Sequence, residues 1–272
     1  MPEGDTVWRA ARSLDRALAG QILTSTDFRV PQLATVDLSG GKVLRTLSRG
    51  KHLLTRIEAR EAWTLHTHLK MEGSWHIYQP GQKWRRPAHE ARVVLSCEGR
   101  MAVGFALGIV ELVPRHREGD VVGHLGPDLL GPDWDEDEAL NRLSADPDRP
   151  VHEALLDQTC LAGIGNMYAA ELCFTSGVHP LVPIGDVTEL ARMVRRAHQM
   201  LEQNKDRSEQ TTTGDMRRGR RHWVYRRDQQ PCLRCQTSIE VGESRDGRAT
   251  YWCPSCQPAP QNQATQNQTT EN

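Results

Sequence analysis

Apolar residues near the start of the chain recur with the spacing of a helix. From Val7 to Leu18 they return every three or four positions, and Gly20 follows. This spacing predicts an amphipathic helix with one buried face, which the glycine ends. Asp5 or Thr6 is expected to cap the helix, because short polar side chains accept hydrogen bonds from the first unpaired amides.

Between positions 21 and 113 the pattern changes to short strand-like runs. Gly-Gly, Arg-Gly, Pro-Gly and Glu-Gly pairs separate these runs, which is typical of tight turns. The predicted strands are 43–48, 52–58, 62–69, 74–78, 91–97 and 100–106. Many short strands at close spacing favour an antiparallel sandwich or barrel.

Helical spacing returns after a stretch rich in Gly, Pro and charge. The predicted helices are 134–145, 151–156, 166–175 and 187–204. The final residues are rich in Gln, Asn and Thr and are expected to be disordered, because they hold little apolar surface to bury. We therefore predict an α+β multidomain chain with an N-terminal β domain, a linker, a helical domain, a zinc finger and a tail. Their expected bounds are 1–115, 116–132, 133–227, 228–256 and 257–272.

Two Cys-x-x-Cys pairs give the strongest local signal. They are Cys232 with Cys235 and Cys253 with Cys256, and 17 residues separate the pairs. Four thiolates at this spacing predict one structural Zn²⁺, because two such turns present four sulfurs to a tetrahedral ion. The segment between the pairs is expected to form a hairpin. A redox pair or free thiols are the alternatives.

The overall charge hides a local asymmetry. The chain has 34 Lys+Arg and 35 Asp+Glu, which gives a net charge of −1. Acids crowd positions 133–138, whereas six arginines lie within positions 217–227 without one acid between them. This asymmetry suggests an acidic outer surface and a basic working face. No run of 18 apolar residues occurs and no signal-peptide pattern is present, so we expect a cytoplasmic protein without a membrane anchor.

Three further features are candidates for chemistry. The turn Gly163-Ile164-Gly165 precedes Asn166 and a helix, which can form an anion site or an ordinary helix–helix turn. Arg248 follows a predicted hairpin turn, where it can grip a phosphate or simply lie in solvent. Pro2 would carry a nucleophilic amine once Met1 is removed, with Glu3 beside it for proton transfer. From these two residues alone, an ordinary N-terminus remains the simpler interpretation.

Taken together, the motifs resemble those of the formamidopyrimidine-DNA glycosylase / endonuclease VIII family of base-excision repair enzymes. The matching segments are Met1–Gly4, Arg49–Lys51, His68–Gly73, Gly126–Asp128, Gly163–Asn166 and the four-cysteine segment that holds Arg248. The resemblance covers residues 1 to about 256. It implies a β-sandwich with a leading helix, a helix–two-turn–helix domain and a zinc finger, acting as a monomer on damaged double-stranded DNA.

The resemblance also implies roles for single residues. Pro2 would be the nucleophile that forms a Schiff base with the damaged nucleotide, and Glu3 the proton donor that opens the sugar. Lys51 would donate a proton in β-elimination, and Arg248 would serve δ-elimination and phosphate binding. Asn166 would hold a backbone phosphate.

The flipped-out nucleotide of such an enzyme leaves a hole in the DNA, and a loop of the protein fills it. Lys70 and Met71 lie on the matching loop, and Met71 is expected to be a wedge rather than a residue that packs the sandwich edge. His124 stands where endonuclease VIII relatives usually have a phosphate-binding arginine, so it is expected to contact DNA.

The segment Gly104–Ile109 lacks the Arg-Phe wedge of formamidopyrimidine-type members, which favours endonuclease VIII and oxidised pyrimidines. Removal of 8-oxoguanine or formamidopyrimidine is one alternative. The other is a zinc protein that binds lesions without catalysis.

Overall fold

The computed structural model describes residues 2–260, and its chain divides into two compact units, Met1–Pro132 and Asp133–Asn272. The first unit begins with helix α1 (Gly4–Leu18), which buries Val7 and Leu14. The prediction that Asp5 or Thr6 caps this helix is wrong, because the helix begins before both residues. Glu3 is the N-cap, without a side-chain cap bond, and its carbonyl accepts a hydrogen bond from the Val7 amide at 3.0 Å.

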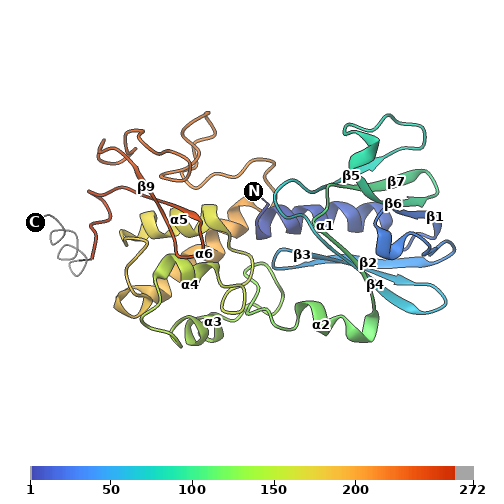
Figure 1. Cartoon of the computed structure of the whole chain (residues 1–272), viewed down its shortest axis with the longest axis horizontal. Helices are drawn as coiled ribbons and strands as arrows, with labels where there is room; N and C mark the ends of the chain where they lie inside the picture. Colours follow the sequence, from blue (N-terminus) through green and yellow to red (C-terminus); the bar gives the residue numbers. More distant parts are fainter. Residues whose placement is uncertain (1, 261–272) are drawn as a thin grey trace, which may run out of the picture. The chain divides into compact units, whose positions relative to one another are not determined.

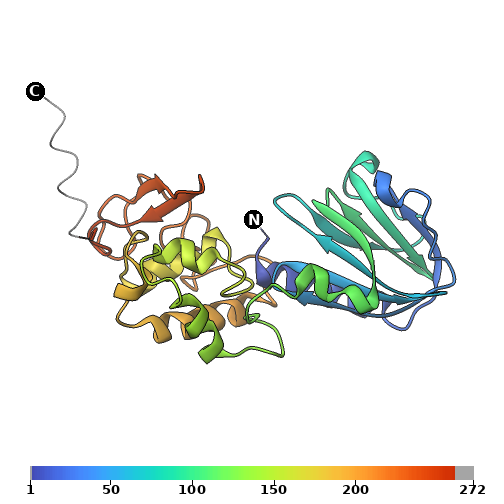
Figure 2. The same cartoon turned by 60° about the horizontal axis from the view of Figure 1, so that its bottom comes forward.

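Two four-stranded antiparallel sheets form the rest of this unit and face each other (Figures 1 and 2). One sheet has the order β2 (Lys42–Arg49), β3 (His52–Glu58), β4 (Ala62–His68), β8 (Ile109–Pro114). The other has the order β1 (Leu23–Phe28), β6 (Ala91–Cys97), β7 (Arg100–Phe105), β5 (Ser74–Tyr78). Leu53, Leu65 and Leu95 belong to the apolar core of this sandwich, together with the buried face of α1.

The strands β1 and β8 escaped prediction because neither alternates regularly between buried and exposed positions. A register shift between Leu23 and Ser25 interrupts β1, and four of its six residues are not buried. β8 has no buried residue and lies at the edge of its sheet. A strand of this kind lacks the period-two signal on which sequence reasoning depends.

The segment 116–132, predicted to be a linker, instead packs on the first unit. It begins in the short helix η3 (Arg115–Arg117) and continues through α2 (Gly119–Val122). Glu118 accepts hydrogen bonds from Arg56 at 2.6 and 3.0 Å and from the Thr64 hydroxyl at 2.7 Å. Three hydrogen bonds to one carboxylate fix this segment against the sheet.

The second unit is built on helices. These are α3 (Glu136–Leu143), α4 (Val151–Leu156), α5 (Asn166–Ser176) and α6 (Leu190–Asn204), with the short η4 (Ile184–Asp186). α5 is buried from Met167 to Phe174 and ends at Gly177, whose φ of 69° is the left-handed conformation that glycine tolerates. A two-stranded hairpin, β9 (Glu240–Glu243) and β10 (Ala249–Trp252), completes the unit.

The predicted tail begins too early at residue 257. Gln257 is fully buried, and its side chain accepts a hydrogen bond from the Cys253 amide at 3.0 Å and donates one to the Val178 carbonyl at 2.8 Å. It therefore belongs to the folded unit. The remainder of the predicted tail from residue 261 onward lies outside the described residues.

Candidate functional site

The N-terminal candidates lie at the beginning of α1. Pro2 is half-buried, and the Glu3 side chain is fully buried. The two residues predicted to act on the sugar therefore differ in exposure, with Pro2 the more accessible.

The tip of the β2–β3 hairpin is tied to a distant motif of the same unit. The Gly50 amide donates to the Asp128 carboxylate at 2.8 Å, and Arg49 donates to the Gly126 carbonyl at 3.0 Å. Gly50 has a φ of 54°, a conformation that side chains other than glycine rarely adopt. These contacts join two motifs that are far apart in sequence and fix the backbone that carries Lys51, which is itself half-buried.

The connection between β4 and β5 holds Lys70 and Met71. Lys70 has a positive φ of 51°, and its amide donates to His68 Nδ1 at 2.9 Å. The Lys70 side chain packs directly against Gly108. A Cβ on Gly108 would lie 2.1 Å from that side chain, so a larger residue would not fit there without a shift of Lys70. Met71 is 59% exposed, so most of its side chain is accessible to solvent.

Four histidines gather on the sheet that holds β3 and β4. The His52 ring centroid lies 5.0 Å from those of His66 and His68 and 6.4 Å from that of the exposed His124. Burial, reinforced by neighbouring imidazoles and lysines, lowers the pKa of His52 to about 3 and that of His68 to about 4. Sequence reasoning missed His52 and His66, although the alternation His66-Thr67-His68 placed two imidazoles on one face of a strand.

In the second unit, a turn leads from α4 to α5. Gly163 has a φ of 112°, so this position requires glycine. The Gln158 amide group donates to the carbonyls of Leu156 and Ile164, at 2.9 Å each, and closes the turn. Asn166 then begins α5, and its Nδ2 donates to the Ala249 carbonyl of β10 at 2.8 Å. The predicted phosphate-binding asparagine therefore also joins α5 to the hairpin.

The four predicted zinc ligands come together. The possible ligand atoms of Cys232, Cys235, Cys253 and Cys256 all lie within 4.8 Å of one another. Separations of 3.4 and 3.5 Å join the Cys235 sulfur to those of Cys253 and Cys256, which is too long for a disulfide. Among residues 2–260 this is the one cluster of at least three His, Cys, Asp or Glu side chains with metal-site spacing. The donor set and its compactness are compatible with a structural zinc.

Arg248 lies where the hairpin returns into β10, and its side chain is half exposed. Its Nε pairs with Asp246 at 2.9 Å, and its amide donates to the Ser244 hydroxyl at 3.1 Å. The Arg245 amide donates to Glu153 of α4 at 3.3 Å. Arg248 and Glu153 both line a pocket of about 460 Å³. The finger arginine thus stands at an open, charged pocket between the hairpin and α4.

His152 of α4 is buried within this unit. It is 1% exposed, and burial lowers its pKa to about 4. The Asp246 carboxylate offsets part of this shift in the His152 pKa. Within the described part of the chain, both ring nitrogens of His152 and the Asn166 Oδ1 lack a hydrogen-bond partner. An unbonded buried imidazole is costly to protonate.

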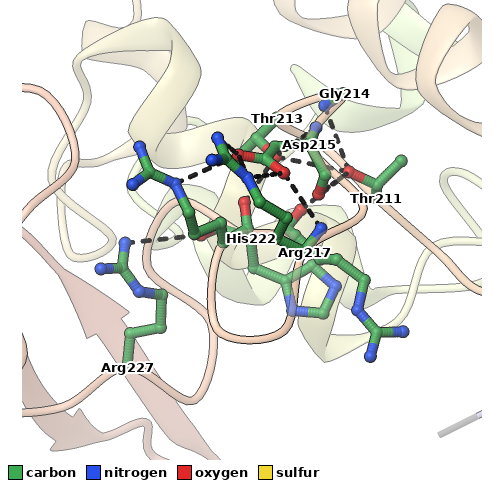
Figure 3. Close-up of polar contacts among 9 residues, drawn as sticks. Thr211, Thr213, Gly214, Asp215, Arg217, His222 and Arg227 are labelled. Atoms are coloured by element: carbon green, nitrogen blue, oxygen red, sulfur yellow. Dashed lines mark hydrogen bonds and ion pairs between the residues drawn. The ribbon is translucent and has the colours of Figure 1, made fainter.

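The arginine-rich segment is less free than its composition suggested. Figure 3 shows Arg217 paired with Asp215, and two of its nitrogens lie 2.6 and 3.0 Å from that carboxylate. These contacts lower the pKa of Asp215 and raise that of Arg217.

Arg227 departs furthest from the expected basic face, because it is 5% exposed and donates to the carbonyls of Trp223 and Pro231, at 2.8 Å each. It supports the loop and does not form part of a basic surface.

Glu171 organises the same segment and was not predicted. It is fully buried on α5 and accepts hydrogen bonds from the amides of Trp223, Val224 and Tyr225 at 2.8, 2.8 and 2.9 Å. The Thr212 hydroxyl also donates to it. Its position on an otherwise apolar helix was the one available signal, since a buried carboxylate needs several donors.

Two family models match the chain. Residues 1–106 match the formamidopyrimidine-DNA glycosylase N-terminal domain, and residues 125–214 match the formamidopyrimidine-DNA glycosylase H2TH domain. The chain belongs to this family. The second match spans the helices α3 to α6, including the α4–α5 turn and Asn166. The family resemblance inferred from the motifs is thereby confirmed.

Curated relatives match over nearly the whole length. The probable endonuclease 8 2 of Streptomyces coelicolor is 53% identical over 96% of this chain and 95% of its own length. The DNA-(apurinic or apyrimidinic site) lyase Nei2 of Mycolicibacterium smegmatis is 50% identical over 95% of this chain and 100% of its own. Endonuclease 8 of Escherichia coli is 30% identical over 94% and 100%, respectively.

Solved structures show the same fold. A complex of the Lactococcus lactis Fpg protein with DNA containing an abasic site has a TM-score of 0.78 and 22% identity, and the match covers 94% of this chain and 100% of that one. The predicted α+β fold, with a β-sandwich, a helical H2TH domain and a cysteine cluster, is confirmed. None of the helices in residues 2–260 has the length and apolar character needed to cross a membrane.

Proposed function

We propose that the protein is a bifunctional DNA glycosylase/AP lyase of base-excision repair, which removes oxidised bases and cuts the strand by β,δ-elimination. The main support is the family membership, together with the Pro2-Glu3 pair at the first turn of α1. Relatives named endonuclease 8 and AP lyase match 94–96% of the chain. Oxidised pyrimidines are the proposed lesions. Because the substrate would be chromosomal DNA, the proposed location of the enzyme is the cytoplasm.

Pro2 is the proposed nucleophile. After removal of Met1, its nitrogen attacks C1′ of the damaged nucleotide, the base leaves, and the sugar is held as an iminium ion. The iminium withdraws electrons from C2′, so a proton leaves there and the 3′ phosphate departs. Half-burial of Pro2 is suited to this role, because the amine must reach a flipped-out sugar.

Glu3 is the proposed proton donor to the sugar ring oxygen. Its complete burial separates it from bulk water, and the first turn of α1 holds its backbone. A carboxyl group that is shielded in this way transfers protons to a bound substrate rather than to solvent.

The other assigned residues would bind DNA or assist elimination. Lys51, on the fixed hairpin tip, would donate a proton in β-elimination, and Arg248 would assist δ-elimination and bind phosphate. Asn166 would bind a backbone phosphate at the start of α5, where helix amides favour anions. Hydrogen bonds hold the backbone amides of Gly50, next to Lys51, and of Arg248, and the Asn166 side chain is bonded to β10.

Lys70, Met71 and His124 are proposed DNA contacts. Met71 would fill the space left by the flipped nucleotide, and its 59% exposure supports this role over packing at the sandwich edge. His124 would contact phosphate, and its exposed ring beside His52 leaves it accessible to DNA.

One structural Zn²⁺ is the proposed cofactor, held by Cys232, Cys235, Cys253 and Cys256. Four thiolates complete a tetrahedral shell, so the ion would shape the hairpin that carries Arg248 and would not activate water. Native mass spectrometry should find one zinc per chain. A metal-free, folded protein with oxidised cysteines would contradict the proposal.

Borohydride trapping tests the Schiff base. The purified protein should form a covalent adduct with an abasic duplex, and mass spectrometry should place the linkage on the Pro2 nitrogen. Pro2→Gly should reduce the adduct strongly, whereas Pro80→Gly in an exposed turn should not. An adduct on another residue, or none on any damaged strand, would reject Pro2 as the nucleophile.

Glu3→Gln separates the two activities. Base removal should fall by about 100-fold or more, the usual contribution of a general acid, while cleavage of a preformed abasic site persists. Glu61→Gln, at an exposed turn, is the matched control. Equal loss of both activities would contradict the assigned role. Comparing thymine-glycol with 8-oxoguanine duplexes then decides the lesion class.

A further inference from the structure

The register of three strands arranges a row of polar side chains on one face of a sheet. His66 of β4 pairs with Leu54 of β3 on one side and with Glu111 of β8 on the other. Two residues further along β4, His68 pairs with His52 of β3. Residues that pair directly in an antiparallel sheet project to the same face. The alternate residues, such as Leu53 and Leu65, face the apolar core.

Two hydrogen bonds join this row into a chain. His66 Nδ1 lies 3.0 Å from a Glu111 oxygen, and His66 Nε2 lies 2.8 Å from His52 Nδ1. An ionised carboxylate only accepts hydrogen bonds, so the proton of a neutral His66 is on Nδ1 and its Nε2 accepts from His52 Nδ1–H. The lone pair of a neutral His52 is then on Nε2, which takes no part in these two hydrogen bonds.

The two ends of this chain meet different surroundings. The Glu111 side chain is 53% exposed and borders a pocket of about 560 Å³ at the sandwich edge. The His66 side chain between them is only 3% exposed. The other end, at His52, is surrounded by His68, His124 and the Lys70 side chain. The chain thus connects a solvated carboxylate to a basic cluster through a buried ring.

We propose that Glu111, His66 and His52 form a proton relay that couples the binding of a DNA phosphate beside His52 to the uptake of one proton. The identity of the ligand rests on the proposed function, whereas the relay rests on the hydrogen bonds. In this scheme Glu111 and His66 are positioning residues, because they act through His52.

Protons and charge balance along the relay. A proton that binds His52 Nε2 displaces the Nδ1 proton of His52 to His66 Nε2, and the Nδ1 proton of His66 moves to Glu111. Both rings change tautomer and remain neutral, and the carboxylate becomes a carboxylic acid. The site therefore gains one N–H donor for phosphate and loses one negative charge, without a buried cation forming.

The electrostatics around His52 fit this coupling. Burial and the neighbours His68, His66, His124 and Lys70 lower the pKa of His52, so the ring is neutral in the free protein. Because His52 does not hold a second proton, a proton taken up at its Nε2 is passed on to His66, and the new N–H can donate to a bound phosphate.

The remaining charged groups near His52 do not already supply the negative charge that a bound phosphate would bring. Arg49, paired with His52 across β2 and β3, and Lys51 both add positive charge. Asp128 adds negative charge, but it accepts hydrogen bonds from the amides of Gly50 and Leu130.

Binding at several pH values tests the relay without any chemistry. A duplex with a tetrahydrofuran abasic analogue is titrated at fixed salt between about pH 8 and 6, and calorimetry in buffers of different ionisation heat counts the protons taken up. Wild type should bind up to about tenfold more tightly per pH unit, as one linked proton requires. Glu111→Gln can still accept the His66 hydrogen bond but cannot take the proton. Its proton uptake should therefore fall by close to one.

Two further measurements guard against a merely structural effect. Glu98→Gln, an exposed change between β6 and β7, should keep the wild-type pH slope. Nitrogen-15 NMR of the imidazoles should find His66 as the Nδ1–H tautomer in free wild type. Equal proton uptake in wild type and Glu111→Gln, or His66 as the Nε2–H tautomer, would overturn the relay.

The outcomes also separate the relay from the proposed function. If borohydride traps no adduct while proton uptake still depends on Glu111, the catalytic proposal fails and the relay stands. If Pro2 is trapped in both proteins and their pH slopes coincide, the relay alone fails.

Discussion

The β-sandwich unit and the helical unit hold their polar residues by different means. In the sandwich, strand register sets the positions, as in the Glu111–His66–His52 chain. In the helical unit, many candidate residues lie on irregular segments, which the cysteine cluster and the buried carboxylate of Glu171 support.

This difference indicates which unit is more sensitive to the loss of a single polar group. A β ladder distributes its support over many backbone hydrogen bonds, so the loss of one polar side chain leaves the strands in place. An irregular loop has no such ladder, and its buried amides depend on a few acceptors. We therefore expect perturbations of single groups to be more damaging in the second unit.

Metal removal should give the largest effect. Zinc binding in such sites is worth about 10–16 kcal/mol, which is comparable to the whole stability of a domain. A strong chelator should leave the amides of β9 and β10 unprotected in hydrogen exchange, while β6 and β7 keep their protection. Cys97→Ala, a buried cysteine of the sandwich, should leave zinc content unchanged. Equal loss of protection in both units would contradict the expectation that only the second unit depends on the metal.

Glu171→Gln should give the next largest effect. The amide side chain cannot accept from three backbone amides and a hydroxyl as a carboxylate does, so we expect a loss of about 3 kcal/mol. Urea unfolding measures the loss, and faster amide exchange at positions 223–225 would localise it. Glu138→Gln, whose partly exposed side chain pairs with Arg142, should cost about 0.5 kcal/mol or less. A similar cost at both positions would remove Glu171 from its assigned role.

His152 should give a smaller effect that depends on pH. The folded state holds its pKa near 4, whereas the ordinary value is 6.5, so the unfolded chain takes up the proton first as pH falls. The stabilisation is complete above about pH 6.5 and is lost progressively towards pH 4, by about 2–3 kcal/mol.

His152→Leu should flatten this part of the stability profile, measured by urea unfolding at several pH values. The exposed His116→Leu should not. An unchanged profile in the first variant would show that His152 is not buried in neutral form.

The sequence predicted those parts of the molecule that depend on local pattern. The bounds of β3, β5 and β6 and of α4 agree with the structure, because alternation, helical spacing and turn residues mark them. The cysteine cluster could also be predicted, since its spacing alone encodes the geometry.

Features that depend on distant partners could not be predicted. The helical pattern predicted α5, but nothing near Glu171 indicates that it supports amides more than 50 residues away. Arg227 and Gln257 looked exposed from their polar surroundings, yet each is buried because backbone groups brought by folding satisfy it. The His52–His66 bond likewise depends on strand pairing.

The hydrogen bond from Asn166 to the Ala249 carbonyl joins groups 83 positions apart. It makes the first turn of α5 sensitive to the state of the hairpin. An agent that strips or oxidises the cysteines would therefore act at a distance, since it would release an amide group that the hairpin otherwise restrains. The condition of the cysteine cluster would thus bear directly on the N-terminus of α5.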